Sequence, residues 1–188
     1  METSLFSTRL IQEVQALIHQ ANQFQELDID TLQWRATIQS WSVLECFAHL
    51  NLYGDYYLPV IRKRMEASRS QPEPLYTSGF LGAYFAKSML PKEKLNKMKT
   101  FKDKNPIHTV VDEQVIQQFI VQQEELIALI QGSQELSLSK IKIPTSISNL
   151  IQLRLGDTFQ FLINHMIRHF KQMETVLNQH AASIVSAE

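Results

Sequence analysis

The stretch DTFQFLINHMIRHFKQMETVLNQH, residues 157–180, decides the fold that we expect for this chain. On a helical wheel with 100° per residue, its apolar and polar side chains fall on different sides. The apolar side consists of Phe159, Leu162, Met166, Phe170 and Met173. The polar side consists of Asn164, Arg168, Lys171 and Thr175. We therefore predict a long helix that starts after Gly156-Asp157, with Asp157 and Gln160 at capping-box spacing, and ends near His180.

The same apolar periodicity predicts three further long helices, over about residues 5–26, 42–65 and 112–132. FLGAYFAKSML (80–90) is expected to form a short helix ended by Pro91, and KIKIP (140–144) an extended segment. The chain has only five glycines and six prolines, which favours helices over strands and turns. These features predict an all-α four-helix bundle, with a short extra helix and an irregular segment between the second and third long helices. No repeat or linker divides the chain, so we expect one domain over residues 1–188.

The composition limits the partners and the compartment. A net charge of -1 gives no field that would attract nucleic acid or an anionic membrane surface. No apolar run approaches the ~20 residues needed to span a bilayer, and the N-terminal stretch lacks the basic start and apolar run of a signal peptide. The only cysteine, Cys46, excludes an intramolecular disulfide and fits a reducing compartment. We expect a cytoplasmic protein that binds neither nucleic acid nor membrane.

His165 and His169 are the strongest indication of chemistry. Residues four apart on a helix have Cβ atoms about 5–6 Å apart, so the two imidazoles can converge on one metal ion. His49, in the second long helix, is a candidate for a third ligand. Three neutral imidazoles would leave a coordination position open, as in a reactive site. The alternative is that these are ordinary histidines at the edge of the core. We expect His19, His108 and His180 to be solvated residues without a role.

Two neighbours of His49 have alternative interpretations. Ser42 and Glu45 have the spacing of a capping box, so Glu45 is either a helix cap or a general base. Cys46 is either a soft fourth ligand or a packed apolar side chain. Tyr53 and Tyr56, further along the same helix, are candidates for assisting proton transfer.

The lysine-rich run KEKLNKMKTFKDKNP (92–106) has two interpretations as well. It could bind phosphate or nucleic acid, but spaced lysines without interleaved aromatic residues are more typical of a solvated surface.

Two groups of motifs resemble the DinB-like (DinB/YfiT) family of metal-dependent enzymes. The first comprises WR (34–35), WSVLE (41–45) and AHL (48–50). The second comprises LGDTF (155–159), HMIRH (165–169) and QME (172–174). The resemblance covers nearly the whole chain. It implies a four-helix bundle, a divalent metal held by His49, His165 and His169, and a possible homodimer. In relatives, the activities include thiol-dependent transfer with low-molecular-weight thiols and isomerisation of maleylpyruvate-type acids.

The leading hypothesis is therefore an enzyme that uses a divalent metal to activate water or a thiol for hydrolysis or thiol transfer to a small-molecule substrate. Zinc or nickel is the expected metal, with iron as a further option, because imidazole suits all three. A low-molecular-weight thiol is a candidate cofactor. The alternative is a non-catalytic helical bundle that binds a metal or ligand for stability or sensing.

Overall fold

The computed structural model describes residues 1–91 and 100–186, and this part of the chain is mostly helical. The long helices are α1 (Thr3–Gln25), α3 (Val43–Glu66), α5 (Gln114–Gly132) and α6 (Leu155–Val185). The short ones are α2 (Ile29–Gln33), α4 (Phe80–Met89) and the 3-10 turns Lys102–Lys104 and Ser133–Glu135. The predicted long helices and the helix ended by Pro91 are confirmed. Helix α2 was not predicted and lies between the first two predicted long helices.

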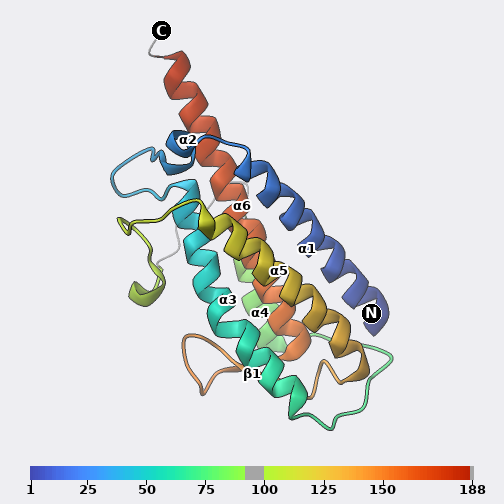
Figure 1. Ribbon diagram of the computed structural model, residues 1–188. Coiled ribbons are helices and arrows are strands. Elements are labelled where there is room, and N and C mark those ends of the chain that lie inside the picture. The colour runs from blue at the N-terminus through green and yellow to red at the C-terminus, as the bar shows by residue number, and fades with distance from the viewer. Residues whose placement is uncertain (92–99, 187–188) are drawn as a thin grey trace.

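The long helices pack around one apolar core (Figure 1). Helix α3 packs against α5 and α6, and α1 also contacts both of those helices. Each long helix contributes one phenylalanine to a cluster of rings with centroids 5.3–5.9 Å apart. The cluster consists of Phe24, Phe47, Phe119 and Phe170. Because Phe170 follows His169 directly, this cluster fixes the part of α6 that carries the paired histidines.

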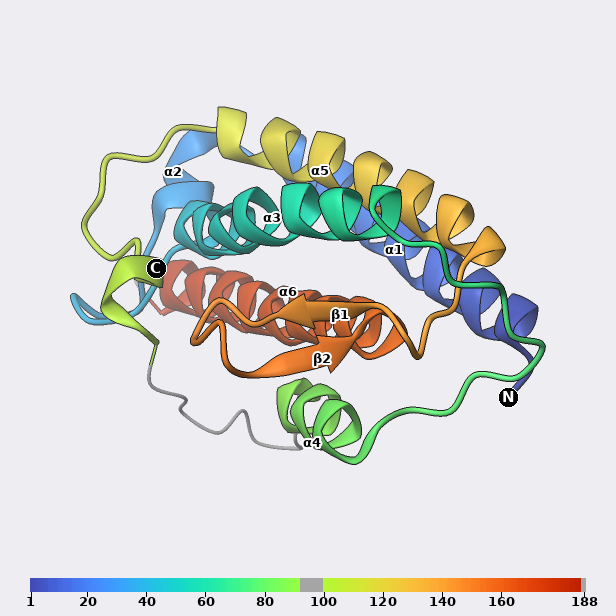
Figure 2. The ribbon, with the colours of Figure 1, turned by 90° about the horizontal axis from the view of Figure 1, so that it is seen from below.

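A small sheet corrects the all-α prediction. Strands β1 (Lys142–Pro144) and β2 (Gln152–Arg154) pair antiparallel, with Ile143 opposite Leu153. KIKIP is extended as predicted, but its partner strand was not foreseen, because a strand of three residues is too short to show an alternating pattern. The hairpin and α4 both contact α6 and lie on the side of the molecule opposite α5 (Figure 2).

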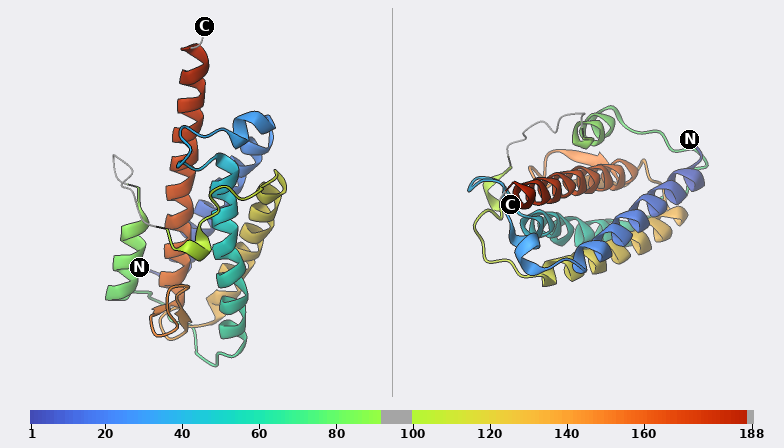
Figure 3. Two further views of the ribbon diagram at one scale, coloured as in Figure 1. Left: turned by 90° about the vertical axis from the view of Figure 1, so that its left-hand side faces the viewer. Right: turned by 90° about the horizontal axis from the view of Figure 1, so that it is seen from above.

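Helix α6 differs from its prediction in three respects. It begins at Leu155 and runs to Val185, so that its last turns project beyond the other long helices (Figure 3). Asp157 does not cap it, because its carboxylate accepts hydrogen bonds from Tyr76, Ser78 and the Gly79 amide instead. The supposed polar side is also partly buried: Asn164 and Arg168 are each 6% exposed. Asn164 donates to the Ala86 carbonyl of α4, which covers this face of the helix.

Candidate metal centre

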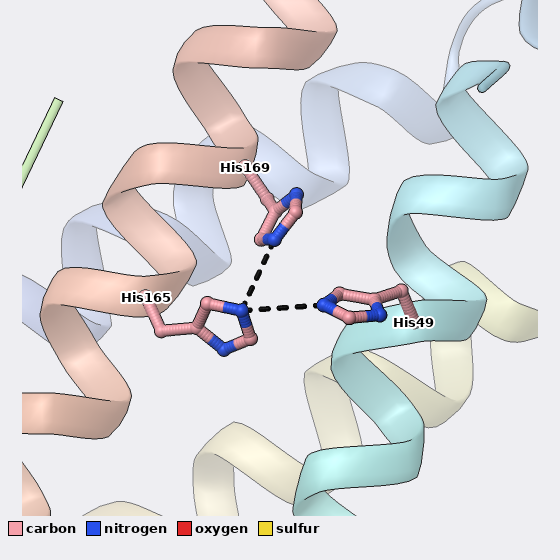
Figure 4. A group of neighbouring side chains, drawn as sticks. All are labelled: His49, His165 and His169. Atoms are coloured by element: carbon pink, nitrogen blue, oxygen red, sulfur yellow. Dashed lines mark hydrogen bonds between the residues drawn. The ribbon is translucent and has the colours of Figure 1, made fainter. Parts of the chain in front are cut away.

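Three histidines from two helices converge inside the molecule (Figure 4). Helix α3 supplies His49, and α6 supplies His165 and His169. The Nε2 atom of His165 lies 3.2 Å from Nε2 of His49 and 3.1 Å from Nε2 of His169. All three side chains are buried, with exposures of 2%, 5% and 7% for His49, His165 and His169. The two sequence-predicted elements therefore bring together the three predicted ligands.

The outer ring nitrogens of two histidines are already bound to the protein. Nδ1 of His49 lies 2.6 Å from the Lys104 carbonyl oxygen, and Nδ1 of His169 lies 3.0 Å from Oε1 of Gln172. A carbonyl oxygen can only accept, so each Nδ1 carries a hydrogen and donates it. In the neutral rings, Nε2 of His49 and of His169 therefore presents a lone pair to the centre of the cluster.

This arrangement fits a cation. Nε2 of His165 has at most one hydrogen in the neutral ring, so it can donate to only one of the two lone pairs that face it. A metal ion accepts all three lone pairs at once. The two separations from Nε2 of His165 also suit zinc, because ligands at ~2.0–2.1 Å in a tetrahedral shell lie about 3.3 Å apart. Among the described residues, the group of ligand atoms within reach of one another consists of these three histidines.

Burial keeps the three imidazoles neutral. Loss of hydration lowers the pKa of His49 to about 4, against the opposing effect of its hydrogen bond to Lys104. The pKa values of His165 and His169 lie well below the ordinary value, first because of burial and then because of neighbouring positive charge. Metal ligation requires neutral imidazole, so the site is in the form that binds metal throughout the neutral pH range.

Aromatic rings surround the histidines. The Trp41 ring lies 4.8 Å from the His49 ring and stacks on His169 at 5.8 Å. The Tyr53 ring lies 4.4 Å from His165, and Phe161 stacks on the same histidine at 6.1 Å. These rings fix the imidazole orientations and make the surroundings of the centre apolar.

Glu45 lies one turn before His49 on α3, and both oxygens of its carboxylate accept hydrogen bonds. Its carboxylate forms the predicted capping box with Ser42 and binds Arg35 through two hydrogen bonds of 2.9 Å. It also accepts the backbone N–H of His108 at 2.8 Å. Burial raises the pKa of Glu45, but these hydrogen bonds outweigh that effect and hold it below the ordinary value. The contacts favour the capping role, which is confirmed, over the alternative of proton transfer.

The other sequence candidates lie in different surroundings. Cys46 is completely buried among apolar side chains and burial raises the pKa of its thiol, which favours packing over ligation. The Tyr56 hydroxyl donates to the Thr145 carbonyl at 3.1 Å, whereas Tyr53 contacts the histidines. His19 and His108 have exposed side chains, and the His180 ring packs against Trp34.

The segment Lys104–His108 was not identified from the sequence. The lysine run that contains Lys104 was expected to be a solvated surface, yet the Lys104 side chain is only 15% exposed and its carbonyl binds His49. Asn105 accepts from the indole N–H of Trp41 at 3.1 Å. No sequence signal marks a backbone carbonyl or amide as a partner. The lysines at positions 92, 94, 97 and 99 lie outside the described residues.

None of the helices in the described part of the chain is long and apolar enough to cross a membrane.

Of the comparisons with known proteins, the one with family models agrees with this geometry. No curated protein and no solved structure matches the chain. The family model of the DinB superfamily matches residues 10–173, a range that contains all three histidines, the whole of α3 and the first part of α6. The chain therefore belongs to the DinB superfamily.

Proposed function

We propose that this protein is a metal-dependent enzyme in which His49, His165 and His169 hold one divalent ion. The observation that carries the proposal is the convergence of three buried, neutral imidazoles, with no carboxylate or thiolate in the same cluster of described residues. Membership of the DinB superfamily supports it. The packing of α1, α3, α5 and α6 also supports the four-helix bundle that the family resemblance implies.

The donor set determines what the ion would supply. An ion held by these three imidazoles would have a position for water or a thiol and would lower the pKa of that ligand toward neutral. The histidines contribute no negative charge, so the charge of the ion is not compensated by its protein ligands. Imidazole ligands make zinc or nickel the proposed metal and iron a further option.

The protein side chains then hold the reactants and exclude water. Trp41, Phe161 and Tyr53 form an apolar surround that strengthens electrostatic interactions at the centre. Burial raises the pKa of Tyr53 to about 12, so its hydroxyl keeps its proton at neutral pH. Tyr53 is therefore our candidate for donating a hydrogen bond to a substrate oxygen. Hydrolysis and transfer of a low-molecular-weight thiol to a small electrophile are the two reactions that this arrangement supports.

The alternative function is a non-catalytic bundle that binds metal or another ligand for stability or sensing. The observation that favours it is the close cover of the histidines by Trp41 and by the Lys104 carbonyl. A structural zinc normally has four protein ligands and no exchangeable position. The two functions therefore differ in whether an external thiol can reach the ion.

Elemental analysis of protein purified without an affinity tag tests the metal. We expect about one divalent ion per chain in the wild type and loss of that ion in His165→Ala. A wild type without stoichiometric metal, or a mutant that keeps it, would refute the proposal. Titration of the cobalt-substituted protein with thiols then separates the two functions, because only an open position lets the thiol change the visible spectrum.

Several further properties remain predictions. A homodimer is expected from the family resemblance, and light scattering on the purified protein measures it. A cytoplasmic location and the absence of nucleic-acid or membrane binding rest on the composition. A single domain over residues 1–188 rests on the lack of a linker in the sequence.

A further inference from the structure

The segment Lys104–His108 is attached to helix α3 at both of its ends. At one end, the Lys104 carbonyl accepts from Nδ1 of His49 at 2.6 Å. At the other end, the His108 backbone N–H donates to Glu45 at 2.8 Å. His49 and Glu45 are four residues apart on α3, so the segment runs alongside one turn of that helix.

A third contact holds the middle of the segment. Oδ1 of Asn105 accepts from Nε1 of Trp41 at 3.1 Å and from the Ile107 backbone N–H at 3.2 Å. The same Trp41 ring packs on His49 and His169. The segment and the indole thus constrain each other, and both contact the predicted ligands.

The backbone of His108 has a left-handed conformation. Its φ is 62°, in the left-handed region that residues other than glycine rarely adopt. Such a conformation persists only where the surroundings impose it, and it is concentrated at functional sites. Here it directs the N–H of His108 to the Glu45 carboxylate, while its imidazole is exposed to solvent.

We propose that Lys104–His108 is a positioning segment for the metal. Glu45 and Trp41 hold this segment in place, so that the Lys104 carbonyl orients His49. This inference rests on the proposed metal site. The carbonyl fixes the tautomer in which Nε2 of His49 faces the ion. Groups that orient a histidine ligand in this way typically change metal affinity by about 10–100-fold when they are removed. Glu45 then has two roles, since it also caps α3.

Four single variants of the full chain separate these roles. Glu45→Gln weakens the hold on His108, and Asn105→Ala removes the acceptor for Trp41. Ser42→Ala removes the hydroxyl half of the capping box but leaves the Glu45 carboxylate and its contact with His108. Glu125→Gln is the matched control, because Glu125 also pairs with an arginine, Arg62, but lies on α5.

The measurements are zinc affinity, by competition with a chromogenic chelator, and the visible spectrum of the cobalt-substituted protein. We expect Glu45→Gln and Asn105→Ala to weaken zinc binding by about 10–100-fold and to alter the cobalt spectrum. Ser42→Ala and Glu125→Gln should keep the wild-type affinity and spectrum. Circular dichroism shows whether each variant folds. If Glu45→Gln does not fold, the zinc affinity and cobalt spectrum of Asn105→Ala test the inference.

Three results would overturn the inference. Wild-type affinity and spectrum in Asn105→Ala would show that the segment does not position the metal. An equal loss of zinc affinity in Ser42→Ala and Glu45→Gln would show that the effect comes from the stability of the start of α3 and not from the segment. A wild type that binds no zinc would refute the proposed function together with this inference. This result is distinguishable from the other two, because in those the wild type binds zinc.

Discussion

Nε2 of His165 lies 3.2 Å from Nε2 of His49, a residue 116 positions earlier in the chain. The packing of α3 against α6 brings these nitrogens within reach of one ion. A ligand that binds only the folded state stabilises it by mass action. The centre should therefore be detectable as a metal-dependent change in stability, independently of any reaction.

Zinc should raise the thermal unfolding midpoint of the metal-free protein. Free zinc at 100 times its dissociation constant adds about 2.7 kcal/mol to the free energy of unfolding. For a chain of this size, that corresponds to a rise of roughly 5–10 °C, measured by differential scanning calorimetry. His165→Ala should show no rise, whereas His19→Ala, which changes an exposed histidine, should behave as the wild type. An equal rise in His165→Ala would place the zinc elsewhere.

The Glu45 carboxylate should stabilise the protein at neutral pH and lose this effect in acid. Its pKa in the folded protein lies below the ordinary value of 4.5, so the unfolded chain takes up the proton first as the pH falls. The stabilisation is therefore complete well above pH 4.5 and disappears as the pH falls through the folded pKa. We expect Glu45→Gln to lower the free energy of unfolding by about 2–3 kcal/mol at pH 7.

Urea unfolding of metal-free wild type and Glu45→Gln across the pH range measures this difference. The difference in the free energy of unfolding between the two proteins should decrease steadily below about pH 5, because the variant has no carboxyl group to titrate at this position. Metal is removed from both proteins so that its own binding does not contribute. A gap that stays constant into acid would contradict the ionic role of Glu45.

The parts of the structure that the sequence predicted are those that depend on local patterns. Helical periodicity located the long helices, and the Ser42–Glu45 spacing located the start of α3. The spacing of His165 and His169 located two of the three histidines of the candidate metal centre, because residues four apart must share one face of a helix. His49 could only be a candidate, since its approach to α6 depends on how the helices pack.

The parts that were missed or misread depend on contacts between distant segments. The wheel assigned Asn164 to a polar face, but α4 packs there and buries it. Asp157 has the type and spacing of a cap, yet it binds residues about 80 positions earlier instead. Lys104 contributes to the centre through its carbonyl, a group that every residue possesses, so no residue type could have indicated it.

Asp157→Asn should loosen the attachment of α4 to α6. The carboxylate accepts the Tyr76 hydroxyl at 2.6 Å, the Ser78 hydroxyl, and the Gly79 N–H at 3.1 Å. An asparagine offers one acceptor oxygen in place of two, so buried donors lose partners. We expect a loss of about 2–3 kcal/mol in the free energy of unfolding, measured by urea titration.

Tyr76→Phe provides the graded comparison for Asp157→Asn. It removes one of the donors and leaves the carboxylate with the other two, so we expect a smaller loss of about 1 kcal/mol. If Asp157→Asn proved as stable as the wild type, these hydrogen bonds would have no net role in holding α4.

Gly54→Ala should destabilise the protein, although alanine normally favours a helix interior over glycine by about 1 kcal/mol. Gly54 lies where α3 meets α5, and a Cβ atom there would lie 2.0 Å from Oε1 of Gln122. The glutamine would have to turn away and give up its hydrogen bonds to Asp55 and to the Asn51 carbonyl, of 2.8 and 3.3 Å. We expect a net loss of about 1–2 kcal/mol, measured by urea unfolding.

Combining Gly54→Ala with Gln122→Ala separates the clash from the intrinsic helix preference. Without the glutamine side chain, the added methyl group meets no obstacle from it, so Gly54→Ala should become stabilising by up to about 1 kcal/mol in that background. The change of sign is a coupling energy between two residues in contact, which a double-mutant cycle measures directly. If Gly54→Ala stabilised the wild-type protein as well, Gln122 would move at no cost, and α3 would not need a glycine here to approach α5. Because α3 also carries His49, the same variants should be assayed for zinc affinity, which we expect to fall only where the glutamine and the methyl group compete.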